Sequence, residues 1–334
     1  MTQKSFFVIS LDFELYWGMF DKVTLATYGE NIKGVHQAIP EILALFAQYN
    51  IHATWATVGM LMAKNKEDLE SVFPLTSKQP VYPDMNVSAY EYLKQNTLGE
   101  NATGDPYHYG AHLVAKILNA PNQELGSHTF SHYYSLDGSE NAETVFSADC
   151  EAFKKISVRF NQTITSIVFP RNQVTSKALK ICKQFGFTAY RGTPKHFLYT
   201  GKKEQDQTNL FLRALRLIDA YINLSGHHTY SFNTINRTKT KLDELMDVPG
   251  SWFLRPYSKS LSIFENLKMR RIKNAMTYAA KHNEIFHLWW HPHNFGINRK
   301  ENLQNLIEIL NHFKNLQARY GMQSGHMNDI ADLT

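Results

Sequence analysis

Residues 6–14 read Phe-Phe-Val-Ile-Ser-Leu-Asp-Phe-Glu, an apolar run that ends at two carboxylates, Asp12 and Glu14. A short, nearly unbroken apolar run is typical of a strand that is buried on both faces. Residues 31–49 follow with apolar side chains at helical spacing, and residues 51–58 form a second apolar run. A strand, a helix and another strand in this order favour parallel strands joined by a crossover helix.

The same alternation of strands and helices continues along the chain. Further strands are predicted at 123–126, 164–169, 187–190 and 285–290, and helices at 143–160, 174–184, 209–222, 260–282 and 299–319. Two stretches interrupt the alternation, about 74–108, which holds four prolines, and about 195–260. We therefore predict an α/β protein with one domain over residues 1–334. Its expected fold is a (β/α) barrel, with both insertions over the C-terminal face.

The composition is that of a soluble globular enzyme, with 43% hydrophobic and 19% charged residues. The net charge of +5 is modest, and no nucleic-acid-binding motif accompanies it. The sequence contains no apolar stretch of about 18 residues and no secretory leader, so we expect a cytoplasmic protein without a transmembrane helix. It also lacks a Gly-x-Ser-x-Gly elbow, a P-loop and a Gly-x-Gly-x-x-Gly motif, which disfavours a serine hydrolase and a nucleotide cofactor.

Basic residues gather at 267–273, where Lys268, Arg270 and Arg271 fall in a predicted helix. We interpret them as a solvated helix face. The alternative is a surface that contacts the phosphates of a nucleotide- or lipid-linked sugar, or an anionic membrane.

Ionisable residues follow several of the predicted strands, at the end where each strand stops. They are Asp12 and Glu14 after the first strand, His128 and His132, Arg171, and His291 and His293 after the last one. In a (β/α) barrel the carboxyl ends of the strands meet at one face, and active sites are built there. The pattern predicts one shared site.

The most specific pair is His128 and His132, four residues apart. On a helical turn this spacing projects both imidazoles from one face, close enough to bind a single metal ion. Two histidines and one carboxylate, with open positions for water, make a catalytic metal site. Asp12 and Glu14 face the same way in an extended chain, so one can bind the metal while the other accepts a proton from water. The sequence leaves open which carboxylate does which.

The remaining candidates have supporting roles. Arg171 could pair with the catalytic carboxylate and hold it ionised, and His291 could donate a proton to the departing amine, with His293 as the alternative donor. We interpret His287, deeper in the last strand, as a buried structural histidine. Substrate contact is expected from Trp17, Trp290 and His293.

These motifs together resemble the NodB-homology polysaccharide deacetylases, carbohydrate esterase family four. The resemblance is carried by Ser-Leu-Asp12-Phe-Glu14, by the segment from Ala53 to Gly59, by Gly126-Ser-His128-Thr-Phe-Ser-His132, by Phe169-Pro-Arg171 and by Trp290-His291-Pro292. It implies a distorted (β/α) barrel of about seven parallel strands. It also implies a metal site for zinc, or for cobalt, nickel or manganese, and an N-deacetylation mechanism. The implied roles are Asp12 as base, Glu14, His128 and His132 as ligands, Arg171 as the partner of the base, and His291 as acid. The sequence departs from the family pattern at Phe13, where a second aspartate would stand.

The expected substrate is an N-acetylated amino sugar in a glycan or a glycan precursor. Residues 212–221 and 254–256 look like a lineage found with surface-polysaccharide and lipopolysaccharide biosynthesis genes, which makes a nucleotide- or lipid-linked sugar a candidate. The alternatives are a hydrolase of a non-sugar amide or cyclic ureide, and an inactive sugar-binding relative. Nothing in the sequence indicates the oligomeric state.

Overall fold

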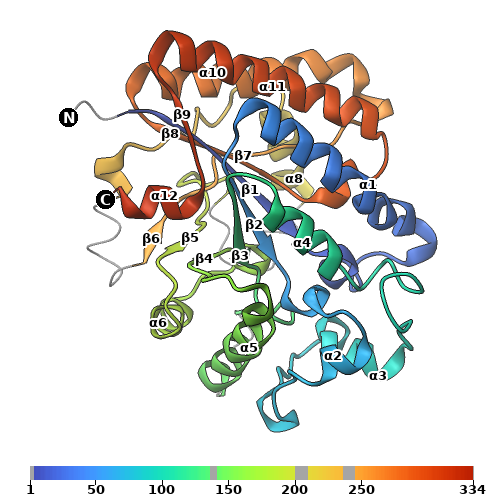
Figure 1. Ribbon diagram of the computed structural model, residues 1–334. Helices are drawn as coiled ribbons and strands as arrows, with labels where there is room; N and C mark the ends of the chain where they lie inside the picture. The colour runs from blue at the N-terminus through green and yellow to red at the C-terminus, as the bar shows by residue number, and fades with distance from the viewer. Residues whose placement is uncertain (1–3, 136–140, 200–209, 236–244, 334) are drawn as a thin grey trace.

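The computed structural model describes residues 4–135, 141–199, 210–235 and 245–333 (Figure 1). Its centre is a sheet of parallel strands with the order β6-β5-β4-β3-β2-β1-β8-β7. A ninth strand, β9 (Gln323–Gly325), pairs with the start of β1. The other strands are β1 (Phe6–Phe13), β2 (Ala53–Thr57), β3 (Gln123–Ser127), β4 (Ser166–Ile167), β5 (Ala189–Tyr190), β6 (Met246–Asp247), β7 (Trp252–Phe253) and β8 (Ile285–Trp290).

One segment, residues 246–254, joins the two ends of this curled sheet. At its beginning, the amide of Val248 donates to the carbonyl of Tyr190 (2.8 Å), beside β5. Near its end, the amide of Leu254 donates to the carbonyl of Trp289 (2.8 Å), beside β8. The predicted distorted barrel is confirmed, with eight strands along its path rather than about seven. The additional strands β6 and β7 have two residues each and lie within the predicted second insertion.

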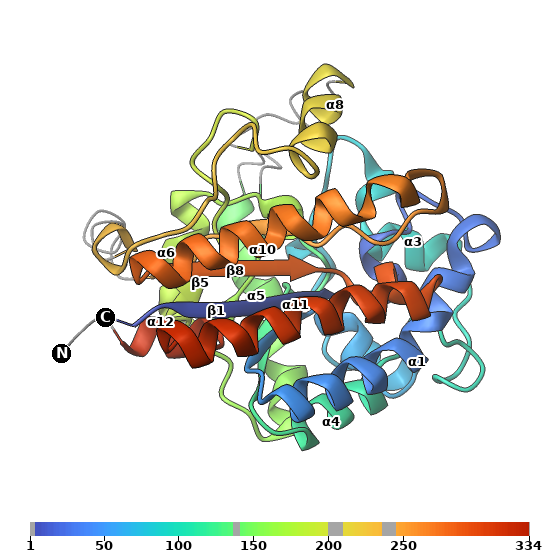
Figure 2. The same cartoon turned by 90° about the horizontal axis from the view of Figure 1, so that it is seen from above.

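Helices cover the outside of the sheet, as Figures 1 and 2 show. The helix α8 (Leu210–Asp219) instead stands away from this layer in Figure 2, beyond α10. The larger covering helices are α1 (Leu25–Tyr49), α4 (Ala111–Asn119), α5 (Ala142–Ser157), α6 (Ser176–Gln184), α10 (Glu265–His282) and α11 (Arg299–Tyr320). Shorter helices are α2 (Lys66–Glu70), α3 (Ala89–Gln95) and α12 (Met327–Asp332).

The helix α1 shows how local sequence sets these elements. Thr24 caps its first turn in a reciprocal capping box with Thr27, which satisfies amides that have no partner within the helix. Its apolar stripe, which includes Ile32, Ile39 and Phe46, is fully buried against the sheet. Asn50 ends the helix in the left-handed conformation.

A close backbone contact positions the segment that follows β8. A Cβ atom on Gly34 of α1 would lie 2.1 Å from the carbonyl oxygen of Gly296. Gly296 directly follows the 3-10 helix η8 (Pro292–Phe295). Only glycine permits α1 to lie this close to η8, so this contact fixes the loop that carries His293.

The first predicted insertion, 74–108, packs behind the 3-10 helix η1 (Leu15–Gly18), which directly follows Glu14. The indole nitrogen of Trp17 donates to the carbonyl of His108 (2.8 Å), and the amide of Tyr16 donates to the carbonyl of Tyr107 (3.0 Å). The insertion therefore supports the chain just beyond β1.

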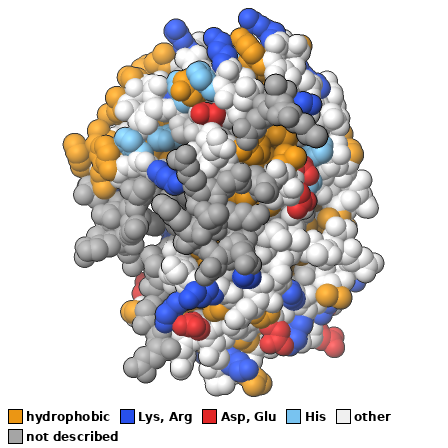
Figure 3. Space-filling model, turned by 90° about the vertical axis from the view of Figure 1, so that its left-hand side faces the viewer, with side chains coloured by type: hydrophobic (Ala, Val, Ile, Leu, Met, Phe, Trp, Pro, Cys, Tyr) orange, Lys and Arg blue, Asp and Glu red, His pale blue; other side chains and the backbone are white. Residues whose placement is uncertain are grey.

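The predicted solvated face at 267–273 is wrong for two of its four basic residues. Lys268 and Arg271 are 2% and 3% exposed. Lys268 donates to the carbonyl of Arg255 (2.9 Å), and the guanidinium of Arg271 lies 4.0 Å from the centre of the Trp252 ring. These two cations hold the second insertion onto α10, whereas Arg270 is exposed. On the face shown in Figure 3, basic, acidic and apolar side chains are interspersed.

No helix in the described part of the chain is both long and apolar enough to cross a membrane.

Candidate active site

A cleft of about 990 Å³ lies at the carboxyl ends of the strands. Seven of the nine predicted site residues line it, namely Asp12, Glu14, His128, His132, Arg171, His291 and His293. Its described lining also draws on the second insertion, including Trp252, Phe253 and Arg255, but on no residue of 74–108. The barrel thus brings together side chains that are far apart in the sequence.

Glu14 is the centre around which the histidines gather. Its Oε1 atom lies 3.0 Å from Nε2 of His128, 3.3 Å from Nε2 of His132 and 3.5 Å from Nε2 of His291. Its Oε2 atom lies 3.8 Å from Nε2 of His293. Ligand atoms bound tetrahedrally to zinc at about 2.1 Å are about 3.4 Å apart, so Glu14, His128 and His132 have the spacing of a metal-binding set.

The hydrogen bonds around His128 also fit a metal. Its Nδ1 atom donates to the carbonyl of Val168 (2.8 Å), because a carbonyl oxygen can only accept. In the neutral imidazole Nε2 then carries a lone pair and faces the Glu14 carboxylate, which also only accepts. Two acceptors at 3.0 Å repel each other unless a proton or a cation lies between them. Glu14, His128 and His132 could together hold a divalent ion, which would supply the positive charge that these acceptors need.

The segment from His128 to His132 is a loop, so the predicted helical turn is wrong. Thr129 and His132 both have positive φ angles, 63° and 56°. The buried carboxylate of Asp149 holds this loop by accepting from the amides of Phe130 (2.7 Å) and Ser131 (3.0 Å). A positive φ at a β-branched residue such as Thr129 is strained, and such strain concentrates at functional sites.

Asp12 is paired with an arginine that the sequence analysis did not select. Both terminal nitrogens of Arg191 donate to Asp12, one to each carboxylate oxygen, at 2.7 Å. Burial alone would raise the pKa of Asp12, but the charge of Arg191, helped by His128, outweighs it and holds that pKa below its usual value. Asp12 is therefore ionised and aimed by a two-pronged partner.

Arg191, and not Arg171, occupies the place predicted for the partner of the base. Arg171 pairs instead with Asp21, and its guanidinium lies 4.0 Å from the centre of the Tyr134 ring. Arg191 directly follows β5, so the rule that active-site residues follow strands could have found it. The Phe-Pro-Arg motif instead indicated Arg171, which follows the neighbouring strand β4.

Residues 18–190 match the family model for polysaccharide deacetylase. The chain belongs to the polysaccharide deacetylase family. No curated protein matches it in sequence.

Solved structures similar to this family member share its fold. A Mycobacterium smegmatis protein described as a polysaccharide deacetylase has 11% identity and a TM-score of 0.57, over 99% of this chain and 91% of that one. A Pseudomonas aeruginosa PAO1 protein described in the same way has 9% identity and a TM-score of 0.52, over 98% and 89%. The Puue allantoinase has 10% identity and a TM-score of 0.52, over 98% and 88%.

Behind Asp12, this deacetylase-family chain has a second layer of hydrogen bonds. Arg191 donates to the hydroxyl of Ser10 (2.9 Å), which donates to Nε2 of His287 (2.8 Å). Nδ1 of His287 donates to the carbonyl of Val248 (3.1 Å). Burial lowers the pKa of His287 to about 3, so it is neutral and its two nitrogens have opposite roles. His287 is the buried structural histidine that we predicted.

The pKa values of His291 and His293 are shifted in opposite directions. Burial would lower the pKa of His291, but the charge of Glu14 beside it raises that pKa above its usual value. Burial lowers the pKa of His293, and its Nδ1 atom lies 2.8 Å from the hydroxyl of Tyr28. His291 is also the more accessible of the two, with 22% of its side chain exposed against 4%.

Both predicted substrate-binding tryptophans are in the core, so this part of the prediction is wrong. Trp17 and Trp290 are fully buried, and the ring of Trp290 stacks on Phe295 with centroids 5.7 Å apart. Trp289 lines the cleft in their place. Side chains alternate along a strand, and Trp289 shares the face of His287 and His291, a signal that could have identified it.

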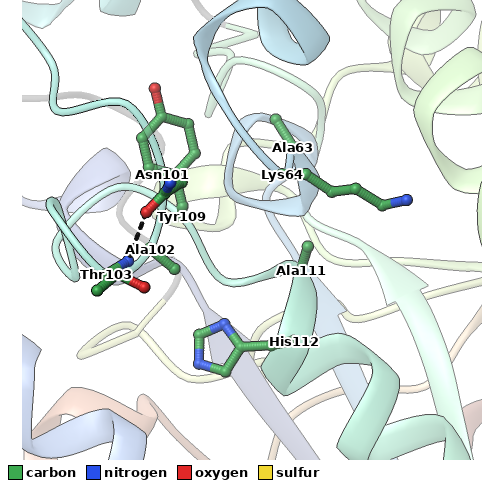
Figure 4. Close-up of a pocket in the computed structure, with 8 residues that line it drawn as sticks. All are labelled: Ala63, Lys64, Asn101, Ala102, Thr103, Tyr109, Ala111 and His112. Carbon is green, nitrogen blue, oxygen red and sulfur yellow. Dashed lines mark hydrogen bonds between the residues drawn. The ribbon is translucent and has the colours of Figure 1, made fainter.

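A second pocket, of about 350 Å³, lies outside this cleft (Figure 4). Its lining residues are Ala63, Lys64, Asn101, Ala102, Thr103, Tyr109, Ala111 and His112. Figure 4 shows Lys64 extending away from the His112 ring, and Asn101 accepts a hydrogen bond from the amide of Thr103 (2.9 Å). Its polar groups do not converge on a common point, unlike those around Glu14.

Proposed function

We propose that this chain is a metal-dependent hydrolase that removes the acetyl group from the nitrogen of an amino sugar in a glycan or glycan precursor. The observation that carries the proposal is that two neighbouring carboxylates, Asp12 and Glu14, have different partners. Asp12 is held ionised by Arg191, and Glu14 faces His128 and His132. Separate environments for neighbouring carboxylates allow one to act as a base while the other binds an ion.

Glu14, His128 and His132 are the proposed ligands, and we propose Glu14 rather than Asp12 as the carboxylate that binds the metal. Asp12 already has two charge-assisted hydrogen bonds to Arg191. When bound, a zinc or similar ion would polarise the acetyl carbonyl and lower the pKa of the attacking water.

Asp12 is the proposed base that accepts the proton from this water. Arg191 keeps it ionised and, through the Ser10–His287 layer, fixed in orientation. Nε2 of His291 lies 3.8 Å from Oδ2 of Asp12, so the two side chains face the same reacting space. His291, with its raised pKa, is the proposed acid that gives a proton to the departing amine.

The walls of the cleft support a sugar substrate. Trp252, Phe253, Trp289 and Tyr28 line it and offer ring faces and edges. Aromatic rings pack well on the flat apolar faces of sugars and carry polar groups at their edges. Proteins with this fold act on several substrates, so the sugar is part of the proposal.

Acetate release tests the proposal. The zinc-loaded wild type should release acetate from chitooligosaccharides and not open the ring of allantoin, the ureide taken as a rival substrate. Asp12→Asn should retain the metal and lose activity by at least about 100-fold. Turnover of allantoin alone would favour the rival amide substrate. Sugar binding without acetate release, at saturating metal, would favour an inactive relative.

A further inference from the structure

Among the described residues that line the cleft, basic side chains outnumber acidic ones. The basic ones are Lys22, Arg171, Lys195, Arg216 and Arg255, and the acidic ones are Asp12, Glu14 and Asp247. Asp12 is neutralised by Arg191, and Glu14 faces the histidines. Arg171 is paired with Asp21. Among the described lining residues of the second insertion, Lys195, Arg216 and Arg255 are basic and Asp247 is acidic, and the proposed deacetylation chemistry uses none of them.

Arg255 differs from the other cleft arginines because its charge is not balanced. Within the described ranges, its guanidinium has no hydrogen-bond or ion-pair partner, although the side chain is half-buried. Burial lowers its pKa, which the neighbouring Tyr199 and Tyr221 only partly offset. A cation withdrawn from water without a counterion is costly, so a ligand that supplies negative charge would bind here favourably.

The backbone places Arg255 beside the proposed reaction centre. Phe253 and Arg255 both line the cleft, whereas Leu254 between them is 1% exposed and points into the core. The Phe253 ring lies 5.8 Å from the ring of His291. Phe253 is paired with Trp289 of β8, and Arg255 follows two residues later along the same wall, next to Tyr199 and Tyr221.

Arg255 is also held in place before any ligand binds. Its carbonyl accepts from the buried ammonium of Lys268 (2.9 Å), and the amide of Leu254 is fixed to Trp289. Arg216, which also lines the cleft, donates to the carbonyl of Leu198, next to Tyr199. The forked guanidinium of Arg255, on a fixed frame, matches the oxygens of a phosphate group.

We infer that Arg255 is the anchor of a phosphate subsite, and that the substrate is an amino sugar that carries a phosphate ester. This inference rests on the proposed function for the reaction, but not for the binding of phosphate. The same chemistry is presented by a sugar phosphate, a nucleotide-linked sugar and a lipid-phosphate-linked sugar.

The binding test uses pyrophosphate as the probe, without turnover. Calorimetric titration is made with the metal-stripped protein and with His128→Ala/His132→Ala, so that phosphate cannot bind through a metal. Arg255→Gln should weaken binding about 10- to 100-fold, because it removes charge-assisted hydrogen bonds, and Arg255→Lys should weaken it less. Arg270→Gln, which removes an exposed arginine on α10, is the matched control.

Equal binding by Arg255→Gln and Arg270→Gln would overturn the inference, as would no binding of millimolar pyrophosphate by the metal-stripped wild type. Thermal melting of each variant verifies that it is folded. Because no reaction is measured, these outcomes are independent of whether the chain deacetylates anything.

The source of the phosphate is distinguished by kinetics. Substrates are N-acetylglucosamine 1-phosphate, UDP-N-acetylglucosamine, a polyprenyl-phosphate-linked N-acetylglucosamine in detergent, and the neutral N-acetylchitotriose. Arg255→Gln should raise KM for the phosphate-bearing substrate that the wild type prefers and leave kcat/KM for the neutral one unchanged. An equal loss on all substrates would show a merely structural role and contradict the subsite.

Discussion

At the scale of single residues, the chemistry depends on how Arg191 holds Asp12. The two hydrogen bonds of 2.7 Å join side chains that are 1% and 4% exposed. Removing one partner of a buried pair leaves the other charge uncompensated, at a cost of about 3–5 kcal/mol.

Arg191→Gln is expected to reduce kcat by at least about 100-fold and to shift the acidic limb of the pH–rate profile to higher pH. Asp12 acts as a base only when it is ionised, and Arg191 lowers its pKa in the wild type. Without Arg191 the pKa of Asp12 rises, so the base becomes active only at higher pH. Arg171→Gln, which loses a pair with Asp21 instead, is the comparison. An unshifted acidic limb in Arg191→Gln, with the fold intact by thermal melting, would contradict this role.

Substitutions of His291 and His293, the two histidines after β8, should have different effects on activity. His291→Asn is expected to lower kcat about 10²- to 10⁴-fold without loss of metal, because it removes from beside Asp12 the proposed proton donor, whose pKa is raised by Glu14. His293→Asn should have a smaller effect, since His293 is bonded to Tyr28 and its pKa is lowered. Acetate release and metal content are measured together on both variants. A larger loss of kcat in His293→Asn would reverse the assignment.

At the scale of elements, the sequence located the long strands and helices well. The strand β8 has the predicted bounds because its six residues, Ile285–Trp290, form a run of aliphatic and aromatic side chains. The strands β6, β7 and β9 were missed, since two or three residues are too few to show a period. The pairing of Arg191 with Asp12 is a tertiary contact that no local pattern encodes.

The loop at 128–132 shows the same limit. Spacing identified His128 and His132, but spacing of four residues predicts a helical turn, and the chain forms a loop with positive φ angles instead. The cause is Asp149, on a later helix, which satisfies the loop amides that a helix would have paired.

Asp149 gives a pH-dependent prediction for this loop. Burial raises its pKa from 3.8 to about 6, so the folded state binds its proton more tightly than the unfolded state. This group's contribution to stability is present below pH 4 and is lost as pH rises through 6, by about 3 kcal/mol in all. Asp149→Asn does not titrate, so its stability deficit relative to wild type should shrink between pH 4 and 7. Denaturant unfolding of the metal-free proteins measures this difference, and a deficit that grows with pH would contradict it.

The contact between α1 and η8 gives a prediction for packing. Gly34→Ala should destabilise the fold by about 1–3 kcal/mol, because the new Cβ would meet the carbonyl of Gly296 at 2.1 Å. Gly29→Ala, in the same helix, meets its nearest atom at 3.4 Å and should be neutral or stabilising by up to about 1 kcal/mol. Denaturant unfolding measures both, and equal stability of the two variants would refute the close contact.

At the scale of the whole molecule, the site exists only because the sheet curls. Asp12, His128, Arg191 and His291 belong to the carboxyl ends of β1, β3, β5 and β8, and residues 246–254 bridge the ends of the sheet. The second insertion both completes this bridge and forms one wall of the cleft. Substrate choice and catalysis are therefore expected to depend on different parts of one domain.

Metal content tests the central claim most directly, because the proposed ligands come from two strands of the folded barrel. Elemental analysis is made on the wild type, Asp12→Asn and His128→Ala/His132→Ala after incubation with zinc and removal of free ions. We expect about one zinc per chain in the first two and none in the double histidine variant. A wild type without metal, or a double variant that retains it, would contradict the proposed site at Glu14, His128 and His132.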